Sequence, residues 1–259
     1  MSEALIHGQS IAFSDSGGAG PVLLLGHGFL MDRDMFAPQV RDLAGEFRVV
    51  TWDGRGHGGT PATAPFTYWD SAADALGLLD HLGIEQAFLG GMSQGGFVAL
   101  RAALVAPARV RGLVLISTQA GLEQPEAVPA YDAMLEEWLA NGPAGVEELV
   151  AAIVLGPGID PAPWFAKWAA LPHESLTLPY RCLMDRDDLT HRLAEIAAPA
   201  ISFHGAEDAA IPMARAEALR DALAGCEELV VVPGAGHASN LARPDIVDPP
   251  LLDFLRAHC

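Results

Sequence analysis

The sequence predicts an α/β fold in which helices cover both faces of a mainly parallel β-sheet. Short β-type runs alternate with longer helix-type segments along most of the 259 residues. Six of the eight β-type runs are almost continuously apolar, as expected for strands that are buried on both faces of a parallel sheet. Residues 120–195 contain no β-type run, so we predict a helical insertion there.

The predicted strands and helices follow one another along the chain. The first two β-type runs, at 4–7 and 10–16, form a predicted hairpin that turns at Gly8 and Gln9. The six apolar runs are PVLLLGHG (21–28), FRVVTWD (47–53), QAFLGG (86–91), VRGLVLIS (110–117), AISFHG (200–205) and ELVVVPG (228–234). A helix over 68–83 has Thr67 as its N-cap and Gly83 at C′. The other predicted helices cover about 34–45, 94–106, 213–224 and 248–257.

The insertion consists of four helix-type segments separated by Pro and Gly. They read YDAMLEEWLANG, GVEELVAAIVLG, PWFAKWAAL and DLTHRLAEIA. The predicted organisation is a core domain formed by residues 1–119 and 196–259, with residues 120–195, the cap segment, inserted in it. Because the chain leaves and re-enters the sheet at the carboxyl ends of strands, we expect the cap segment to cover that edge.

Three of the five tryptophans, Trp138, Trp164 and Trp168, lie in the cap segment. These rings either pack only within the cap segment or form the upper wall of a cavity. We take these three tryptophans as candidate substrate-binding residues, together with Met92, which we expect on the opposite side of the cavity from the cap segment. The cavity is then mainly apolar and suited to a small, uncharged or weakly polar acyl substrate.

Charge and cysteine content restrict the partners and the compartment. The chain has 15 Lys and Arg against 33 Asp and Glu, a net charge of -18, so nucleic acid and anionic membranes are not expected partners. Cys182, Cys226 and Cys259 show neither a disulfide framework nor a zinc-binding spacing. The N-terminal residues do not resemble a signal peptide, and no apolar stretch approaches the ~18 residues of a membrane span. A cytoplasmic location is therefore expected.

The most informative stretch is FLGGMSQGGFVA, residues 88–99, where a predicted strand meets a predicted helix. Within it, Gly91-Met92-Ser93-Gln94-Gly95 matches the G-x-S-x-G pattern of a nucleophile elbow. Such a turn projects the serine hydroxyl above the sheet, and small residues are needed on either side because the bend is tight. The pattern predicts that Ser93 is a catalytic nucleophile.

A serine nucleophile needs a base, and the base needs an acid that orients it. His237 lies in the Gly-rich loop VVVPGAGHASN after the last predicted strand, and it is the candidate base. Asp208, in FHGAEDAAIP after the preceding strand, is the candidate acid, although Glu207 is adjacent to it. The chain order Ser93, Asp208, His237 is the order that this type of elbow uses.

The oxyanion that forms during acyl transfer also needs hydrogen-bond donors. We predict that the backbone N–H groups of Phe29, in the strand-end sequence GHGF, and of Gln94 supply them. His27 and other histidines show no metal-ligand spacing, so neither a metal nor a cofactor is predicted. Asp53 and Arg55, in WDGRGHGG, are interpreted as residues that hold a loop at a strand end.

Five motifs, GHGF, WDGRGHGGT, GMSQGG, GAEDAAIP and GAGH, occur in the order found in α/β-hydrolase fold enzymes, and the resemblance spans about residues 4–258. The resemblance implies an eight-stranded, mostly parallel sheet with a helical cap inserted after the sixth strand. Among the subgroups, the chain looks most like small bacterial esterases and lactonases, including 3-oxoadipate enol-lactonases. HGFLMDRDMFAPQV and ARVRGLVLISTQAG carry that likeness.

These observations predict a serine hydrolase that cleaves a carboxylic ester or a small lactone through an acyl-enzyme. Related epoxide hydrolases and haloalkane dehalogenases use Asp at the elbow, so Ser93 disfavours those activities. Two alternatives stay open: a cofactor-free haloperoxidase or perhydrolase activity on the same triad, and a hydrolase-like ligand receptor. The expected partner is a small-molecule ester or lactone, and the sequence leaves open whether the chain forms a homo-oligomer.

Overall fold

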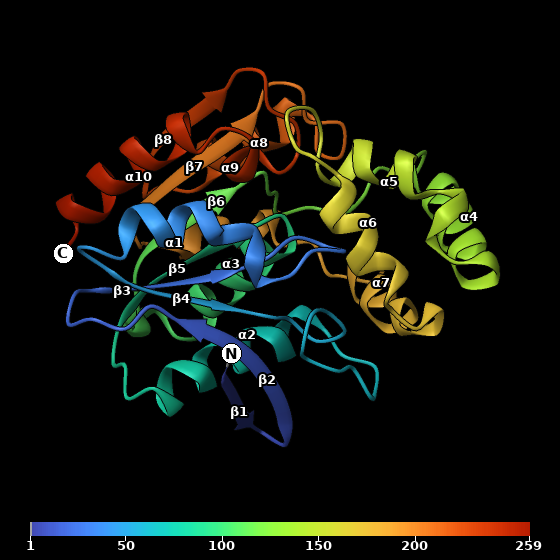
Figure 1. Cartoon of the computed structure of the whole chain (residues 1–259). Coiled ribbons are helices and arrows are strands. Elements are labelled where there is room, and N and C mark those ends of the chain that lie inside the picture. The colour runs from blue at the N-terminus through green and yellow to red at the C-terminus, as the bar shows by residue number, and fades with distance from the viewer. Residues whose placement is uncertain (1) are drawn as a thin grey trace.

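The computed structural model describes residues 2–259, and Met1 lies outside the described residues. Eight strands form one sheet in the order β1-β2-β4-β3-β5-β6-β7-β8 (Figure 1). Their bounds are β1 Ser2–Ile6, β2 Gln9–Asp15, β3 Val22–Gly26, β4 Arg48–Trp52, β5 Ala87–Met92, β6 Val110–Ile116, β7 Ala200–Gly205 and β8 Cys226–Val232. The predicted eight-stranded α/β fold is therefore confirmed.

The sheet is antiparallel at one edge and parallel elsewhere. β1 and β2 form the predicted hairpin, but its turn is at His7 and Gly8, one residue earlier than predicted, because Gln9 already belongs to β2. β2 also pairs antiparallel with β4. All other strand pairs, from β4–β3 to β7–β8, are parallel. Since parallel strands end at the same edge, the segments that follow β3, β5, β7 and β8 meet above one rim of the sheet.

Helices cover both faces of the sheet (Figure 1). Leu43 of α1 and Leu251 of α10 belong to the apolar core on one face, and Leu78 of α2, Leu100 of α3 and Leu219 of α8 belong to the core on the other. Among the described residues, no helix combines the length and the hydrophobicity that crossing a membrane requires. The helices outside the cap segment are α1 Ala37–Leu43, α2 Tyr68–His81, α3 Gln94–Val105, α8 Met213–Ala222, α9 Ser239–Ala242 and α10 Pro244–Ala257.

Of two helix boundaries predicted from local sequence signals, one was right and one was wrong. Thr67 caps α2 through a reciprocal capping box with Asp70, and Gly83 follows the helix with φ +67°, as predicted. By contrast, α10 begins at Pro244, four residues before the predicted start at 248. Pro244 occupies the first turn, where a missing N–H costs nothing, and the helix continues through Pro249 and Pro250.

The cap segment is helical, and Figure 1 shows its helices gathered on one side of the molecule. A helix that was not predicted, α7, contains Pro179 near its start, and the predicted helical segment at 188–197 forms only a 3-10 helix over Thr190–Glu195. The division into core domain and cap segment remains a proposal. The cap helices are α4 Val128–Asn141, α5 Glu147–Val154, α6 Ala162–Ala169 and α7 Thr177–Met184.

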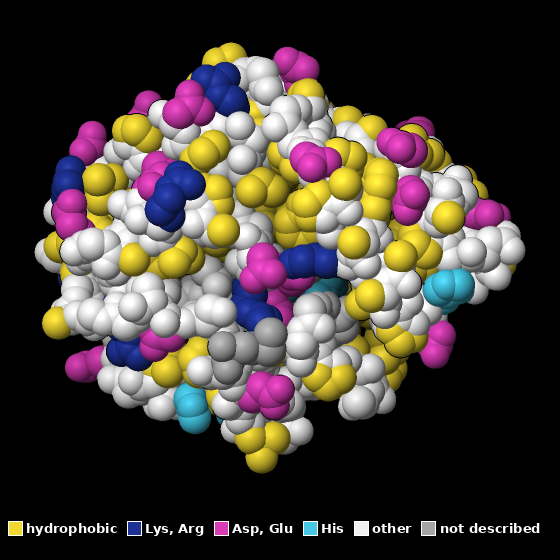
Figure 2. All heavy atoms as spheres, in the orientation of Figure 1, with side chains coloured by type: hydrophobic (Ala, Val, Ile, Leu, Met, Phe, Trp, Pro, Cys, Tyr) yellow, Lys and Arg dark blue, Asp and Glu magenta, His cyan; other side chains and the backbone are white. Residues whose placement is uncertain are grey.

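Acidic side chains dominate the charged surface in the view of Figure 2, where Asp and Glu are spread over both the core and the cap segment. This distribution accords with the net charge of -18. A dispersed negative charge of this kind favours solubility.

Candidate active site

Ser93 stands alone between β5, which ends at Met92, and α3, which begins at Gln94. Its backbone has φ +51° and ψ -111°, a conformation that L-residues rarely adopt. The Ser93 N–H donates to the Ile116 carbonyl at 2.9 Å, and its carbonyl accepts from the Thr118 hydroxyl at 2.8 Å. These bonds hold the strained turn against the end of β6.

The two glycines of the elbow are required by close backbone contact with β3. A Cβ on Gly91 would lie 2.1 Å from the Gly26 carbonyl oxygen, and a Cβ on Gly95 would lie 1.9 Å from the same oxygen. Gly91 also has φ +158°. Any side chain at either position would push α3 away from the sheet and would displace Ser93.

His237 and Asp208 come from the loops after β8 and β7 and are hydrogen-bonded. The His237 Nδ1 to Asp208 Oδ2 distance is 2.8 Å, and both side chains are buried. The other oxygen, Oδ1, accepts from the N–H groups of Ala210 and Ile211, each at 2.9 Å. With Asp208 ionised, Nδ1–H donates and Nε2 remains the nitrogen available to a partner.

The surroundings of Asp208 stabilise its charged form. Burial alone would raise the pKa of Asp208, but the charge of His237, the hydrogen bond from His237 and the Ile211 N–H outweigh burial and lower it. Glu207, the neighbour that the sequence could not separate from Asp208, has an exposed side chain. Of the two neighbouring acids, Asp208 is the one that is hydrogen-bonded to His237.

Sequence reasoning missed a second histidine beside Asp208. His204 Nε2 lies 3.5 Å from Asp208 Oδ2 and donates to the Ile211 carbonyl at 2.9 Å. Burial lowers the pKa of His204 and so favours its neutral form, although the Asp208 charge and the hydrogen bond to Ile211 act in the opposite direction. In the sequence, His204 is marked only by its position four residues before Asp208. This spacing is too common to predict that the two side chains lie close together.

The backbone N–H groups of Phe29 and Gln94 have no acceptor within residues 2–259. Gln94 is the first residue of α3, so its N–H belongs to the positive end of the helix dipole. Leu30, directly after Phe29, has φ +61°, which marks a second strained position beside the site.

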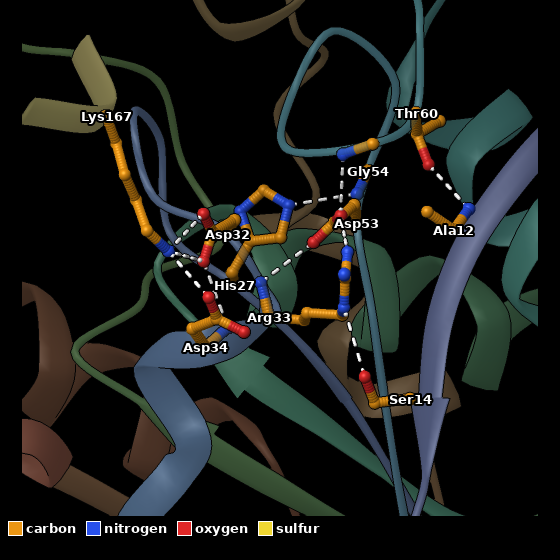
Figure 3. A network of polar contacts seen from close by, with 11 residues as sticks. Ala12, Ser14, His27, Asp32, Arg33, Asp34, Asp53, Gly54, Thr60 and Lys167 are labelled. Carbon is orange, nitrogen blue, oxygen red and sulfur yellow. Dashed lines mark hydrogen bonds and ion pairs between the residues drawn. The ribbon is translucent and has the colours of Figure 1, made fainter. Parts of the chain in front are cut away.

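Buried polar contacts hold the loop that carries Phe29 (Figure 3). His27 Nε2 accepts from the Gly54 N–H at 2.9 Å, so its Nδ1 carries the proton and donates to the Gly28 carbonyl at 2.7 Å. The Asp53 carboxylate accepts from the Arg33 N–H at 2.8 Å and forms an ion pair with the Arg33 guanidinium. Asp53 therefore holds a loop, as interpreted from the sequence.

The cap segment is tied to the same loop through helix α6. Lys167 lies 2.6 Å from a carboxylate oxygen of Asp32 and 2.7 Å from one of Asp34 (Figure 3). The indole N–H of Trp168 donates to the Leu30 carbonyl at 2.6 Å. Cap and core thus meet at the residue that follows Phe29.

Ser93 and His237 line one cavity of about 110 Å³ between the core and the cap segment. Phe29 and Phe97 contribute to its core side, and the cap side is mostly aliphatic and aromatic. The cap side includes Met134, Leu135, Trp138, Val154, Leu176 and Met184. The arrangement places a serine hydroxyl and a histidine in a mainly apolar chamber.

Comparisons with known proteins show which family the chain belongs to. A family model described as the alpha/beta hydrolase fold matches residues 21–244. The chain belongs to the alpha/beta hydrolase fold family.

Several members of the family resemble the chain over nearly its whole length. A thermophilic esterase from Thermogutta terrifontis is 29% identical, with a TM-score of 0.89 and coverage of 100% of this chain and 99% of the esterase. An enol-lactonase from Burkholderia xenovorans is 27% identical, with a TM-score of 0.89 and coverage of 98% and 100%. A Mycobacterium tuberculosis protein named "Putative non-heme bromoperoxidase BpoC" is 29% identical, with coverage of 95% of this chain and 97% of the relative.

The structure brings only one of the four predicted substrate-binding residues of this hydrolase-fold chain to the cavity. Trp138 lines it, whereas Met92, Trp164 and Trp168 are not among the described residues of its wall. Met92 is buried with its sulfur against Gly28, and Trp168 packs edge-on to Trp138, with ring centroids 6.0 Å apart. Aromatic residues fill helix interfaces as readily as they line cavities, so composition alone could not separate the two roles.

Proposed function

We propose that this chain hydrolyses carboxylic esters or small lactones, with Ser93 as nucleophile, His237 as base and then acid, and Asp208 as the group that orients His237. The observation that carries the proposal is the 2.8 Å His237–Asp208 hydrogen bond beside a cavity that Ser93 and His237 both line. The esterase and enol-lactonase relatives support the substrate class.

In the first half-reaction, the Ser93 Oγ attacks the substrate carbonyl carbon while His237 Nε2 takes the hydroxyl proton. The negative charge that develops on the carbonyl oxygen accepts hydrogen bonds from the N–H groups of Phe29 and Gln94. His237 then gives the proton to the leaving alkoxide, and the acyl group stays on Ser93. With a lactone, the alcohol remains attached to the acyl chain.

In the second half-reaction, His237 removes a proton from water, and the hydroxide attacks the acyl carbon. The ester bond to Ser93 breaks, His237 returns the proton to Oγ, and the acid leaves. All these steps use side-chain and backbone groups of the chain, so dialysis against EDTA is expected to leave turnover unchanged.

A fluorophosphonate probe tests the nucleophile, and a panel of p-nitrophenyl esters, small lactones and enol-lactones tests the substrate class through kcat/KM. We expect the probe to label Ser93, and Ser93→Ala to lose both labelling and nearly all turnover. Ser117→Ala is the matched control, because Ser117 is the other described serine at a strand end with positive φ, at +45°. Labelling at another residue, or full activity of Ser93→Ala, would end the proposal.

The bromoperoxidase name of one relative favours perhydrolysis as a second candidate. Hydrogen peroxide in place of water would attack the acyl carbon on Ser93 and release a peracid, which then oxidises bromide. Bromination of monochlorodimedone in acetate, peroxide and bromide measures it. If the wild type brominates no faster than Ser93→Ala, this candidate is removed.

A ligand receptor, the other alternative that the sequence leaves open, would behave differently from both enzymes. It would release one burst of product and would then remain as a persistent acyl-enzyme.

A further inference from the structure

One carboxylate interrupts the apolar wall of the cavity. Glu123, in the segment between β6 and α4, lines the cavity with 15% of its side chain exposed. Its Oε1 accepts from Arg186 at 2.9 Å. Among the described lining residues, Glu123 is the one carboxylate, and neither Lys nor Arg lines the cavity.

Arg186 provides no free positive charge to the cavity. Its side chain is 2% exposed, and besides Glu123 it donates to the carbonyls of Gly121 at 3.1 Å and Leu183 at 2.7 Å. Its guanidinium also stacks on Phe97, 4.8 Å from the ring centroid, and Phe97 itself lines the cavity. The cation is therefore fully engaged behind the wall, while the carboxylate faces the cavity.

Tyr131 also lines the cavity, so its phenol is exposed to the same charges. Burial raises the pKa of the Tyr131 phenol, and the negative charges of Glu123 and Asp208 raise it further, against a smaller effect of Arg186. The anionic form of a group at this wall is thus disfavoured. A substrate carboxylate placed there would lose its water, would find no cation and would face Glu123.

We propose that Glu123 determines specificity: the cavity accepts uncharged acyl groups, and Glu123 excludes acyl groups that carry a carboxylate. This inference rests on the proposed function, since it assigns the substrate class of the Ser93 site. It goes beyond an apolar wall, because an apolar wall alone would disfavour any charge, whereas Glu123 disfavours one sign.

The Glu123–Arg186 pair also joins the two ends of the cap segment, so its structural and electrostatic roles must be separated. Glu123→Gln does so. The Gln side chain keeps an oxygen that can accept from Arg186, so the contact between the two ends is retained. The variant removes only the negative charge and leaves the charge of Arg186 uncompensated.

The test compares two substrates with the same acyl chain, the p-nitrophenyl ester of monomethyl adipate, which is neutral, and p-nitrophenyl hydrogen adipate, which ends in a carboxylate. For the wild type we expect kcat/KM for the neutral ester to exceed that for the charged ester by about 100-fold. The ratio should persist in about 0.5 M salt, where long-range repulsion by the chain's net charge is screened. Glu123→Gln should reduce the ratio to about 5-fold or less.

Glu126→Gln, an exposed acid three residues away, is the matched control and should leave the ratio unchanged. Equal kcat/KM for both esters in the wild type at high salt would overturn the inference, and so would an unchanged ratio in folded Glu123→Gln. If Glu123→Gln does not fold, a third ester, whose acyl chain ends in a trimethylammonium group, decides in the wild type at high salt: Glu123 should make kcat/KM for this cationic ester higher than for the carboxylate, and equal values would overturn the inference. Failure of the proposed function looks different, because neither ester would then be turned over and the probe would not label Ser93.

Discussion

The core wall of the cavity holds its functional groups by hydrogen bonds and strained backbone, whereas the cap wall is held mainly by apolar packing. On the core side, Ser93, His237 and Asp208 each have defined partners within 2.9 Å. On the cap side, Trp138 is buried, and no described residue accepts a hydrogen bond from its indole N–H. The difference implies that substitutions of the functional groups in the core wall change the rate by several orders of magnitude, while substitutions in the cap wall change substrate preference.

The largest expected effect among the orienting residues is that of Asp208→Asn. Because an Asn amide can donate to His237 Nδ1, it favours the wrong tautomer, and kcat should fall by about 10⁴-fold. Steady-state kinetics on p-nitrophenyl butyrate measures it. Glu207→Gln removes the same charge one residue away, from an exposed side chain, and should be mild. The reverse ranking would show that Glu207 is the acid.

Trp168→Phe tests the point where the two walls meet. The variant leaves the Leu30 carbonyl without the indole N–H that now lies 2.6 Å away, next to the Phe29 donor. Removal of a whole oxyanion donor costs about 10²–10³-fold in kcat, so a displaced donor should cost about 10-fold, with little change in KM.

Trp164→Phe is the matched control for this junction. Trp164 is a buried tryptophan of the same helix, α6, and it packs against Lys167 with no hydrogen bond from its indole to another described residue. Its kcat should stay near the wild-type value. If both variants lower kcat equally, Trp168 acts through the stability of the cap segment and not through Leu30.

A smaller and purely selective effect is expected from Trp138→Leu. The smaller side chain enlarges the cavity, so the ratio of kcat/KM for p-nitrophenyl octanoate to that for the butyrate should rise about 3- to 10-fold. Trp164→Leu removes a similar volume from the cap segment outside the cavity wall. It should lower the melting temperature and leave the ratio unchanged. An unchanged ratio in both variants would remove Trp138 from the specificity wall.

The contrast between the walls also explains which features could be predicted from the sequence. Gly91 and Gly95 are irreplaceable at a tight turn, and Asp208 and His237 follow strands that end at the same rim, so type and position identified them. Trp164 and Trp168 were expected at the cavity, and that expectation was wrong because an apolar ring packs equally well between helices and in a cavity wall. The Glu123–Arg186 pair joins residues 63 positions apart, and no local pattern connects them.

Helix boundaries failed for a related reason. Pro179 and Pro244 stand in first turns, where proline is tolerated, and α10 also continues through Pro249 and Pro250 in its interior. Because we took proline as a sign that no helix was present, we missed α7 and started α10 too late. Where a proline falls in a helix depends on the tertiary packing that places the helix start. Single residues with strict backbone requirements could be predicted, whereas interchangeable apolar packing could not.

The smallest expected effect on activity belongs to Asp248, a buried carboxyl of the core outside the cavity wall. Burial raises the pKa of Asp248 to about 6, and the nearby Asp42 carboxyl adds to the rise, against a 2.7 Å hydrogen bond from Gln39. Asp208, also a buried carboxyl group, has its pKa lowered because the charge and hydrogen bond of His237 and the N–H of Ile211 outweigh burial. The charged form of a buried carboxyl group in the core is therefore favoured only where donors or positive charge outweigh the cost of burial.

Asp248→Asn tests that statement. Between about pH 4 and 6 the folded protein holds a proton on Asp248 that the unfolded chain has released, so the free energy of unfolding should fall as pH rises through this window. Asp248→Asn should flatten the fall and add ~1–2 kcal/mol at pH 8, less than the full shift implies because water screens the partly exposed Asp42. Urea unfolding from pH 4 to 8 measures this. Asp253→Asn, 80% exposed in the same helix, should behave like the wild type. If Asp248→Asn keeps the wild-type slope, the pH dependence arises from other groups, and the contrast between the two buried aspartates fails.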